Sequence, residues 1–215
     1  MRLPSPCRAV PTALILTLLL AGPSWPLEPV WSHLPVGLPA DSLAPSLLRL
    51  ESRGSRALAA SAAYTLGQFH HARGEYRPAA ESFGRAAARL TGEERADARY
   101  GQGLALLGAQ DAGRARAAFE DVAASSVSLR AFAQLGLAQA HALSGETSRE
   151  MEVLRRLLDG PAGEAEPAAL ERYAALCDRL SRASDATAAR ERLLRRWPRS
   201  FEAARLGPLP LRVTP

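Results

Sequence analysis

The side chains best suited to chemistry are few in this sequence, and their spacing does not fit an active site. Histidine and cysteine commonly ligate metals or support nucleophilic catalysis, and the 215 residues include four His and two Cys. His70 and His71 are adjacent, so on a helix their imidazoles point in different directions, and His141 follows far along the chain. We expect these imidazoles to be packed or half-exposed, and we expect no metal site.

The motifs of common enzyme classes are missing as well. The sequence has no phosphate-binding loop, no dinucleotide-binding glycine motif, no His-Glu-x-x-His, no pair of Cys-x-x-Cys motifs and no Gly-x-Ser-x-Gly. It contains no Lys, so all 27 basic residues are Arg, which excludes Schiff-base chemistry and a phosphate-loop lysine. Carboxylates alternate with arginines, as in 93–95 and 190–192, which is typical of solvated helix faces. The sequence therefore predicts a protein that is not an enzyme and has no cofactor.

Small and aromatic residues instead recur at a fixed period. The step between equivalent positions is 36 residues, which is the length of a helical hairpin in stacked-repeat proteins. A Gly or Ala in each helix lets two backbones approach closely, and a Phe fills the seam beside the next hairpin. Cys177 stands at such a close-approach position, so we expect a buried small side chain and not a reactive thiol. The recurring pairs are Gly67 and Gly103, Ala79 and Ala115, and Phe83 and Phe119.

Over about residues 55–206 the chain resembles the tetratricopeptide repeat (TPR) family. Repeats of that family place Leu-Gly in the first helix and, in the second helix, an Ala followed four residues later by a Phe. The first hairpin matches at Leu66, Gly67, Gly74, Tyr76, Ala79, Phe83 and Ala86, and the second at Gly103, Ala115, Phe119 and Val122, with Gln102 in the Leu place. The resemblance implies an all-α fold, an α-solenoid of about four TPR-like helical hairpins.

The expected hairpins cover 57–90, 95–125, 129–159 and 167–196, with turns at 74–75, near 110–111, at 144–146 and at 183–185. The Gly- and Pro-containing stretch 160–166 is the longest interruption, so we expect the fourth hairpin to be displaced or hinged relative to the third. Before the array, residues 41–52 predict a short amphipathic helix whose apolar side is formed by Leu43, Leu47, Leu48 and Leu50.

The N-terminus has the order of a secretory signal peptide. Arg2 and Arg8 precede the apolar run 13–21, and small residues follow it, with a cut before Trp25 or after Ala21. We therefore expect a signal peptide over 1–24, a Pro-rich linker with the short helix over 25–54, the TPR-like array over 55–206 and a flexible tail over 207–215. The mature protein is then periplasmic or secreted, with no stable transmembrane span.

In the TPR family the first helix of each hairpin lines a concave groove, and the resemblance assigns that role to matching positions here. A ladder of Tyr, Gln and Leu suits an extended or helical peptide, because amides hold its backbone and apolar side chains fill pockets. The alternative is that some of these side chains pack on the N-terminal helix or on each other. The groove residues are Tyr64, Gln68, His71, Tyr100, Leu104, Leu107, Phe132, Leu135, Gln139, Asp178 and Arg182.

The resemblance implies an exported scaffold or adaptor that binds a protein or peptide partner in a bacterial envelope. The segment 197–203 (WPRSFEA) is similar to the ends of repeats in periplasmic TPR proteins. Two alternatives stay open: a structural or self-assembling subunit that uses the repeat ends, and a binder of anionic polymers. The second rests on the C-terminal region, where ten Arg face four acids from Arg172 onward, a net +6. We expect no nucleic-acid partner.

Overall fold

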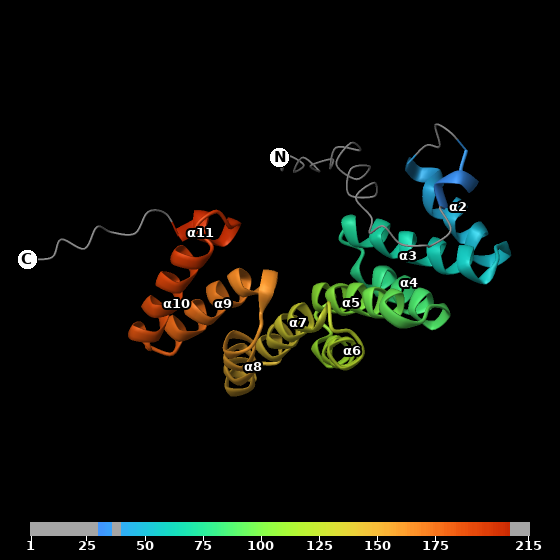
Figure 1. Cartoon of the computed structure of the whole chain (residues 1–215). Coiled ribbons are helices and arrows are strands. Elements are labelled where there is room, and N and C mark those ends of the chain that lie inside the picture. The colour runs from blue at the N-terminus through green and yellow to red at the C-terminus, as the bar shows by residue number, and fades with distance from the viewer. Residues whose placement is uncertain (1–29, 36–39, 207–215) are drawn as a thin grey trace, which may run out of the picture. The chain divides into compact units, whose positions relative to one another are not determined.

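The structure, a computed structural model, describes residues 30–35 and 40–206. The signal peptide expected over 1–24 and the tail expected over 207–215 lie outside the described residues. Within them the secondary structure is helical and contains no strand. The chain divides into two compact units, Met1–Ala109 and Gln110–Pro215, and each is described by itself (Figure 1).

Unit 1 consists of successive antiparallel helices. Its α3 and α4 form the first expected hairpin, α5 packs against α4, and α2 packs against α3 (Figure 1). The Ser55 side chain caps α3 by accepting a hydrogen bond from the Leu58 amide at 3.1 Å. The elements are η1 (Val30–His33), α2 (Ala40–Arg53), α3 (Arg56–Ala72), α4 (Tyr76–Arg89) and α5 (Gly92–Gly108).

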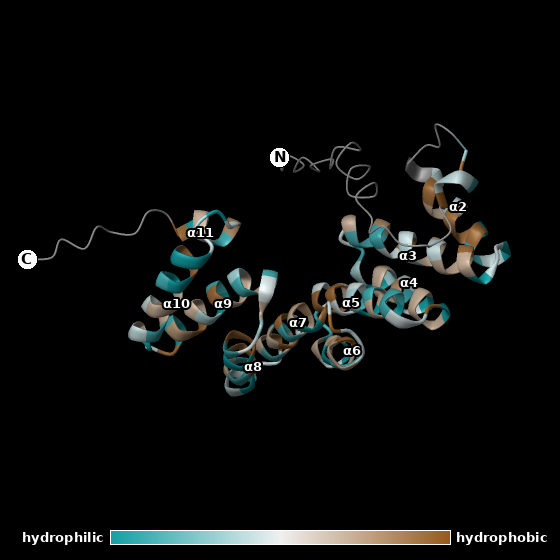
Figure 2. Cartoon of the chain, in the orientation of Figure 1, coloured by the Kyte–Doolittle hydropathy of each residue, from teal (hydrophilic) through white to brown (hydrophobic). Residues whose placement is uncertain are grey.

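The apolar side of α2 covers α3. Leu47 is fully buried against Leu58, Leu66 and Phe69, and hydrophobic residues of both helices meet there (Figure 2). Leu48, which was expected on the same side of the helix, is 49% exposed because it lies one position, about 100° of rotation, beyond Leu47.

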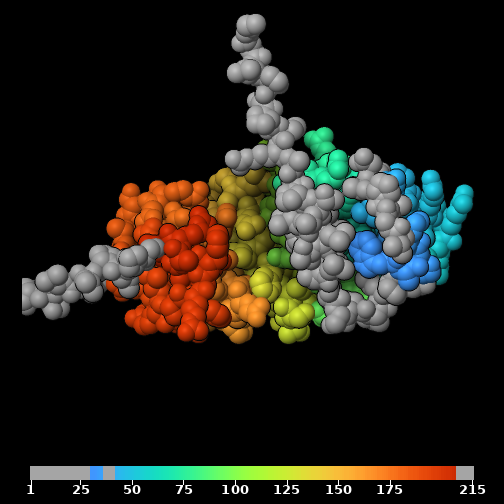
Figure 3. Space-filling view, turned by 90° about the horizontal axis from the view of Figure 1, so that it is seen from above, coloured from blue at the N-terminus to red at the C-terminus, as the bar shows by residue number. Residues whose placement is uncertain are grey.

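Unit 2 continues the same pattern. The helices of its two hairpins, α7 with α8 and α9 with α10, pack against each other, and α11 packs on α9 and α10 (Figure 1). In the space-filling view the residues of the last helices, coloured orange to red, lie against one another (Figure 3). The elements are α6 (Ala112–Ser125), α7 (Arg130–Leu143), α8 (Thr147–Asp159), η2 (Gly163–Ala165), α9 (Glu166–Arg179), α10 (Ala183–Arg196) and α11 (Phe201–Leu206).

The last turn lies three residues before its expected place. It occupies 180–182 and not 183–185, because Ser181 takes a left-handed backbone with φ of 57° and the Arg182 amide closes onto the Cys177 carbonyl at 2.8 Å. The same backbone occurs at the corresponding position of every turn between the two helices of a hairpin. The φ values there are 73° at Gly74, 61° at Gln110, 72° at Gly145 and 57° at Ser181.

Aromatic rings seated on glycines hold neighbouring helices together. Phe83 of α4 is 4% exposed, and its ring lies so close to Gly67 and Gly101 that a Cβ at either position would be 2.8 or 2.9 Å from it. In unit 2, a Cβ at Gly136 of α7 would lie 2.6 Å from the fully buried ring of Phe119. The repeat pattern predicted such a close approach at Gly67, whereas Gly101 and Gly136 are not among the glycines that it singled out.

Buried glutamates join the helices by a second kind of contact. In unit 1, the Glu51 side chain of α2 pairs with Arg85 at 2.7 Å and Arg89 at 3.3 Å, both on α4. In unit 2, Glu150 of α8 is 1% exposed and pairs with two arginines of α9, Arg172 at 3.0 Å and Arg179 at 3.1 Å.

A third buried glutamate, Glu166, lies at the start of α9 and is 3% exposed. It pairs with Arg192 at 2.6 Å and Arg196 at 2.7 Å and accepts a hydrogen bond from the Trp197 indole at 2.9 Å. Burial alone would raise the pKa of Glu166, but the hydrogen bonds from Trp197 and Arg192 outweigh it and lower that pKa. The carboxylate therefore stays ionised, and it ties α9 to α10 and to the chain that follows.

The close contact between the Phe119 ring and Gly136 can be tested with two alanine substitutions in unit 2. Gly136→Ala should lower the free energy of unfolding by about 1–3 kcal/mol, because the added methyl overlaps the Phe119 ring. Gly113→Ala should raise it by about 0.5–1 kcal/mol, because no atom lies within 4 Å of a Cβ there and alanine favours the helix. Urea unfolding measures both. If both substitutions changed the free energy of unfolding equally, the close contact between Gly136 and the Phe119 ring would be contradicted.

Candidate functional site

One face of unit 1 is built from the first helices of two successive hairpins, α3 and α5, which contact each other. Its side chains follow helical spacing, at 64, 68 and 71 on α3 and at 97, 100, 104 and 107 on α5, so they form one stripe on each helix. All are half-buried. We call this surface the α3–α5 face, and its residues are Tyr64, Gln68, His71, Asp97, Tyr100, Leu104 and Leu107.

Two tyrosines lie on the α3–α5 face. The Tyr64 ring meets the Phe83 ring edge-on, with centroids 5.4 Å apart and planes at 72°. Burial and the nearby Asp97 carboxylate raise the pKa of Tyr64 to about 12, and burial also raises the pKa of Tyr100. A phenol with the ordinary pKa of 10.0 is already neutral at physiological pH, so these upward shifts leave both tyrosines as neutral hydroxyls.

Asp97 is the residue of this face that the sequence analysis missed. Its half-buried carboxylate makes no hydrogen bond or ion pair with any residue that the structure describes. Burial, and then the negative charges of Glu93 and Glu94, raise the pKa of Asp97 to about 6. The sequence did contain a signal for Asp97. It precedes Tyr100 by three residues and Leu104 by seven, a spacing that places all three on one side of a helix.

Arg99, two residues after Asp97 on α5, points elsewhere. Arg99 donates a hydrogen bond to the Gln102 side chain at 2.7 Å, and the Gln102 amide donates to the Ala80 carbonyl of α4 at 3.2 Å. Gln102 fits in the place where the repeat pattern has Leu because Gly84 leaves room for its amide. The Asp97 carboxylate thus lies on the α3–α5 face, whereas the Arg99 side chain lies toward α4.

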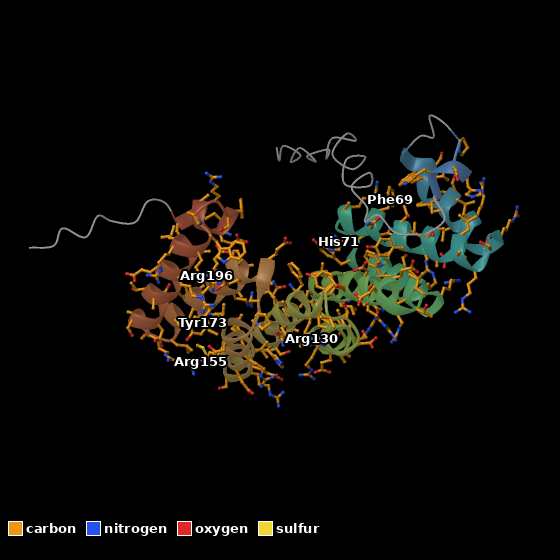
Figure 4. The ribbon with its side chains drawn as sticks, in the orientation of Figure 1. Phe69, His71, Arg130, Arg155, Tyr173 and Arg196 are labelled. Carbon is orange, nitrogen blue, oxygen red and sulfur yellow. The ribbon has the colours of Figure 1, made fainter. Side chains whose placement is uncertain are left out.

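The α3 side of the face contributes an amide and an imidazole. Gln68 has no hydrogen-bond partner among the described residues. His71 lies near the end of α3 (Figure 4), its ring edge-on to Tyr76 at 5.5 Å, and burial lowers the pKa of His71, which favours the neutral ring. His70 instead faces the turn, with its Nδ1 2.5 Å from the Glu75 carboxylate.

The expected groove residues of unit 2 have varied surroundings. Phe132 and Gln139 of α7 are half-buried, whereas Leu135 is 9% exposed and belongs to the core. Asp178 and Arg182 are engaged in ion pairs, with Arg190 and Asp185 respectively.

A cleft of about 440 Å³ opens beside α7 in unit 2. Phe132 and Arg130 line it from α7, Arg156 and Leu157 from α8, and residues 160–164 from the segment after α8. Val127, also in the lining, is 78% exposed. The cleft is therefore bounded by the α8 end and by the interruption that separates the two hairpins of unit 2.

Metal-binding geometry is absent from the part of the chain that the structure describes, where no three His, Cys, Asp or Glu side chains come together. His141 pairs with Glu146, its Nδ1 at 2.7 Å from the carboxylate, as His70 does with Glu75. Cys177 is fully buried. Within the same residues, no helix is long and apolar enough to cross a membrane.

Solved structures share this architecture at low sequence identity, although no protein-family model and no curated protein matches the sequence. A kinesin-light-chain-type protein of Podospora anserina with nearly identical TPR-like repeats gives a TM-score of 0.59 at 16% identity, over 72% of this chain and 82% of that one. The chain has the TPR fold. The TPR protein YrrB gives 0.57 at 14% identity, over 77% and 84%, and PilF of Pseudomonas aeruginosa gives 0.51 at 17%, over 78% and 80%.

These likenesses agree with the helices observed here. The all-α, α-solenoid class with TPR-like hairpins, predicted from the repeat, is confirmed. Within this TPR fold, α3 and α5 hold the position of first helices.

The state of Asp97 predicts a pH-dependent stability. Because its folded pKa of about 6 lies above the ordinary value of 3.8, its ionisation opposes folding: the stability is fully present below about pH 4 and is lost as pH rises through 6. A shift of this size corresponds to at most about 3 kcal/mol, and solvent screening of a half-exposed group reduces it to about 1 kcal/mol.

Asp97→Asn should therefore unfold at higher urea concentration than the unmodified protein at pH 7.5, and the gap should close near pH 4. Glu81→Gln, at an exposed carboxylate of α4, is the control and should show no such gap. A gap for Asp97→Asn that stays constant with pH would show that its carboxylate is not destabilised.

Proposed function

We propose that this chain is a protein-interaction scaffold that binds an extended or helical segment of a partner protein along the α3–α5 face. The observation that carries the proposal is the pair of half-buried polar side chains without partners in the described structure, Gln68 and Asp97, set among tyrosine and leucine. Shielded polar groups that lack partners gain most from a ligand that supplies them.

The chemistry of the face suits a peptide. The Gln68 amide can donate to a peptide carbonyl and accept from a peptide N–H, and Leu104 and Leu107 offer apolar contact beside it. The similar structure of YrrB is described as having an unusual peptide-binding site, which supports a peptide ligand for this fold.

The binding of an anionic polymer by the Arg-rich C-terminal region has less support. Seven of its ten arginines pair with carboxylates of unit 2 itself. Their charge is largely used within the fold, so little of it is available to an external polyanion.

We further propose that the protein works in a bacterial envelope, outside the cytoplasm, on the strength of the signal-peptide-like residues 1–24. A fusion of the full chain to alkaline phosphatase, which is active only after export, should be active. The same fusion lacking 1–24 should be inactive. Activity of both, or of neither, would contradict export by this segment.

Peptide binding can be tested with a matched pair of charge-introducing variants. Twelve-residue peptides selected from a randomised phage library on the full chain are synthesised, and their Kd values are measured by fluorescence anisotropy. Leu104→Asp should weaken peptide binding, raising the Kd about tenfold or more, because it puts a charge at the centre of the face. Ala88→Asp, on an exposed position of α4, should leave the Kd unchanged.

Circular dichroism verifies that both variants are folded. Peptides that bind Leu104→Asp as tightly as the unmodified chain would show that the α3–α5 face is not the binding surface. Equal weakening by the two variants would contradict the proposal as well.

A further inference from the structure

We infer that the α3–α5 face takes a partner segment that carries a cationic side chain, Arg or Lys, and that this cation lies against Asp97 beside Tyr64. The inference rests on the proposed function, and it specifies which class of peptide the face selects.

Other shielded carboxylates of this chain are paired with arginines. Glu51, Glu150 and Glu166 each pair with two arginines of a neighbouring helix. The Asp97 carboxylate is also shielded, yet no arginine of the described structure reaches it. A carboxylate removed from water gains most from a cation, because charge-assisted hydrogen bonds are stronger than neutral ones.

Several cations of unit 1 are engaged away from Asp97. Arg85 and Arg89 pair with Glu51, Arg73 with Glu75, and Arg99 bonds Gln102 on the α4 side. On α5, Glu93 and Glu94 add negative charge close enough to raise the pKa of Asp97. Along 93–99 of α5, three carboxylates outnumber two arginines. The local charge of this stretch is therefore negative in a chain whose net charge is +5, so a cationic ligand complements it.

The α3–α5 face also offers an aromatic ring, that of Tyr64. Tyr64 and Asp97 both lie half-buried on the α3–α5 face, and the negative charge of Asp97 contributes, after burial, to raising the pKa of the Tyr64 phenol. An aromatic ring attracts the guanidinium or ammonium group, and its apolar surface accommodates the aliphatic part of Arg or Lys. A metal ion fits less well, because no three ligating side chains of the described structure meet here.

The experiment compares two selections from the same randomised dodecapeptide phage library at pH 7.5, one on the full chain and one on its Asp97→Asn variant. Peptides from the full chain should be enriched in Arg or Lys at one position, and those from Asp97→Asn should lose that enrichment. The variant retains a side chain of the same size and relieves a charge that opposes folding, so loss of structure does not confuse the comparison.

A second measurement isolates the charge itself. In a selected peptide, the enriched Arg is replaced by citrulline, which has nearly the same shape and no charge. The full chain should bind the citrulline peptide about tenfold more weakly. Asp97→Asn should bind the two peptides within about twofold of each other, since the carboxylate that distinguishes them is gone.

The outcomes separate this inference from the proposed function. Peptides that require Leu104 but show no basic preference, or keep that preference on Asp97→Asn, would overturn the inference and leave the scaffold proposal standing. A library that yields no peptide sensitive to Leu104→Asp would overturn both. Basic enrichment that vanishes with Asp97→Asn, together with the citrulline effect, supports the inference.

Discussion

The ring of Phe83 lies against the backbone of two successive first helices, and this contact determines how closely α3 and α5 approach. Gly67 and Gly101 have no side chain there, so the ring occupies the space that two methyl groups would need. Tyr64 then packs edge-on against the same ring. The contact of Phe83 with Gly67 and Gly101 sets the distance between α3 and α5. The geometry of the α3–α5 face follows from that distance, because the residues of the face lie on the same two helices.

The buried glutamates add selectivity to a core that is rich in alanine. Alanine contacts are small and similar to one another, so they specify the register between helices weakly, whereas a carboxylate that needs two arginines fits in one place. Buried ion pairs contribute little net stability, but breaking one is costly. Glu51, Glu150 and Glu166 thus fix which helices pair, and each engages two arginines.

The sequence predicted those parts of the fold in which a residue type, such as glycine or phenylalanine, has a single structural role. The glycine and phenylalanine positions predicted the hairpins, and turns were expected at Gly74 and Gly145, where the backbone is left-handed. The turn at Ser181 was misplaced because serine rarely adopts that backbone and gives no signal for it. Asp97 was missed because three carboxylates and two arginines are mixed along 93–99, and the sequence does not say which of them pair.

The central claim is that a partner segment lies along α3 and α5. Methyl NMR of the full chain tests it most directly, with Leu and Val methyl groups labelled and a library-selected peptide added. We expect shifts confined to Leu104, Leu107 and their neighbours on the face, with none at Val153 or Leu194 of unit 2. Shifts that appear in unit 2 and spare Leu104 and Leu107 would contradict it.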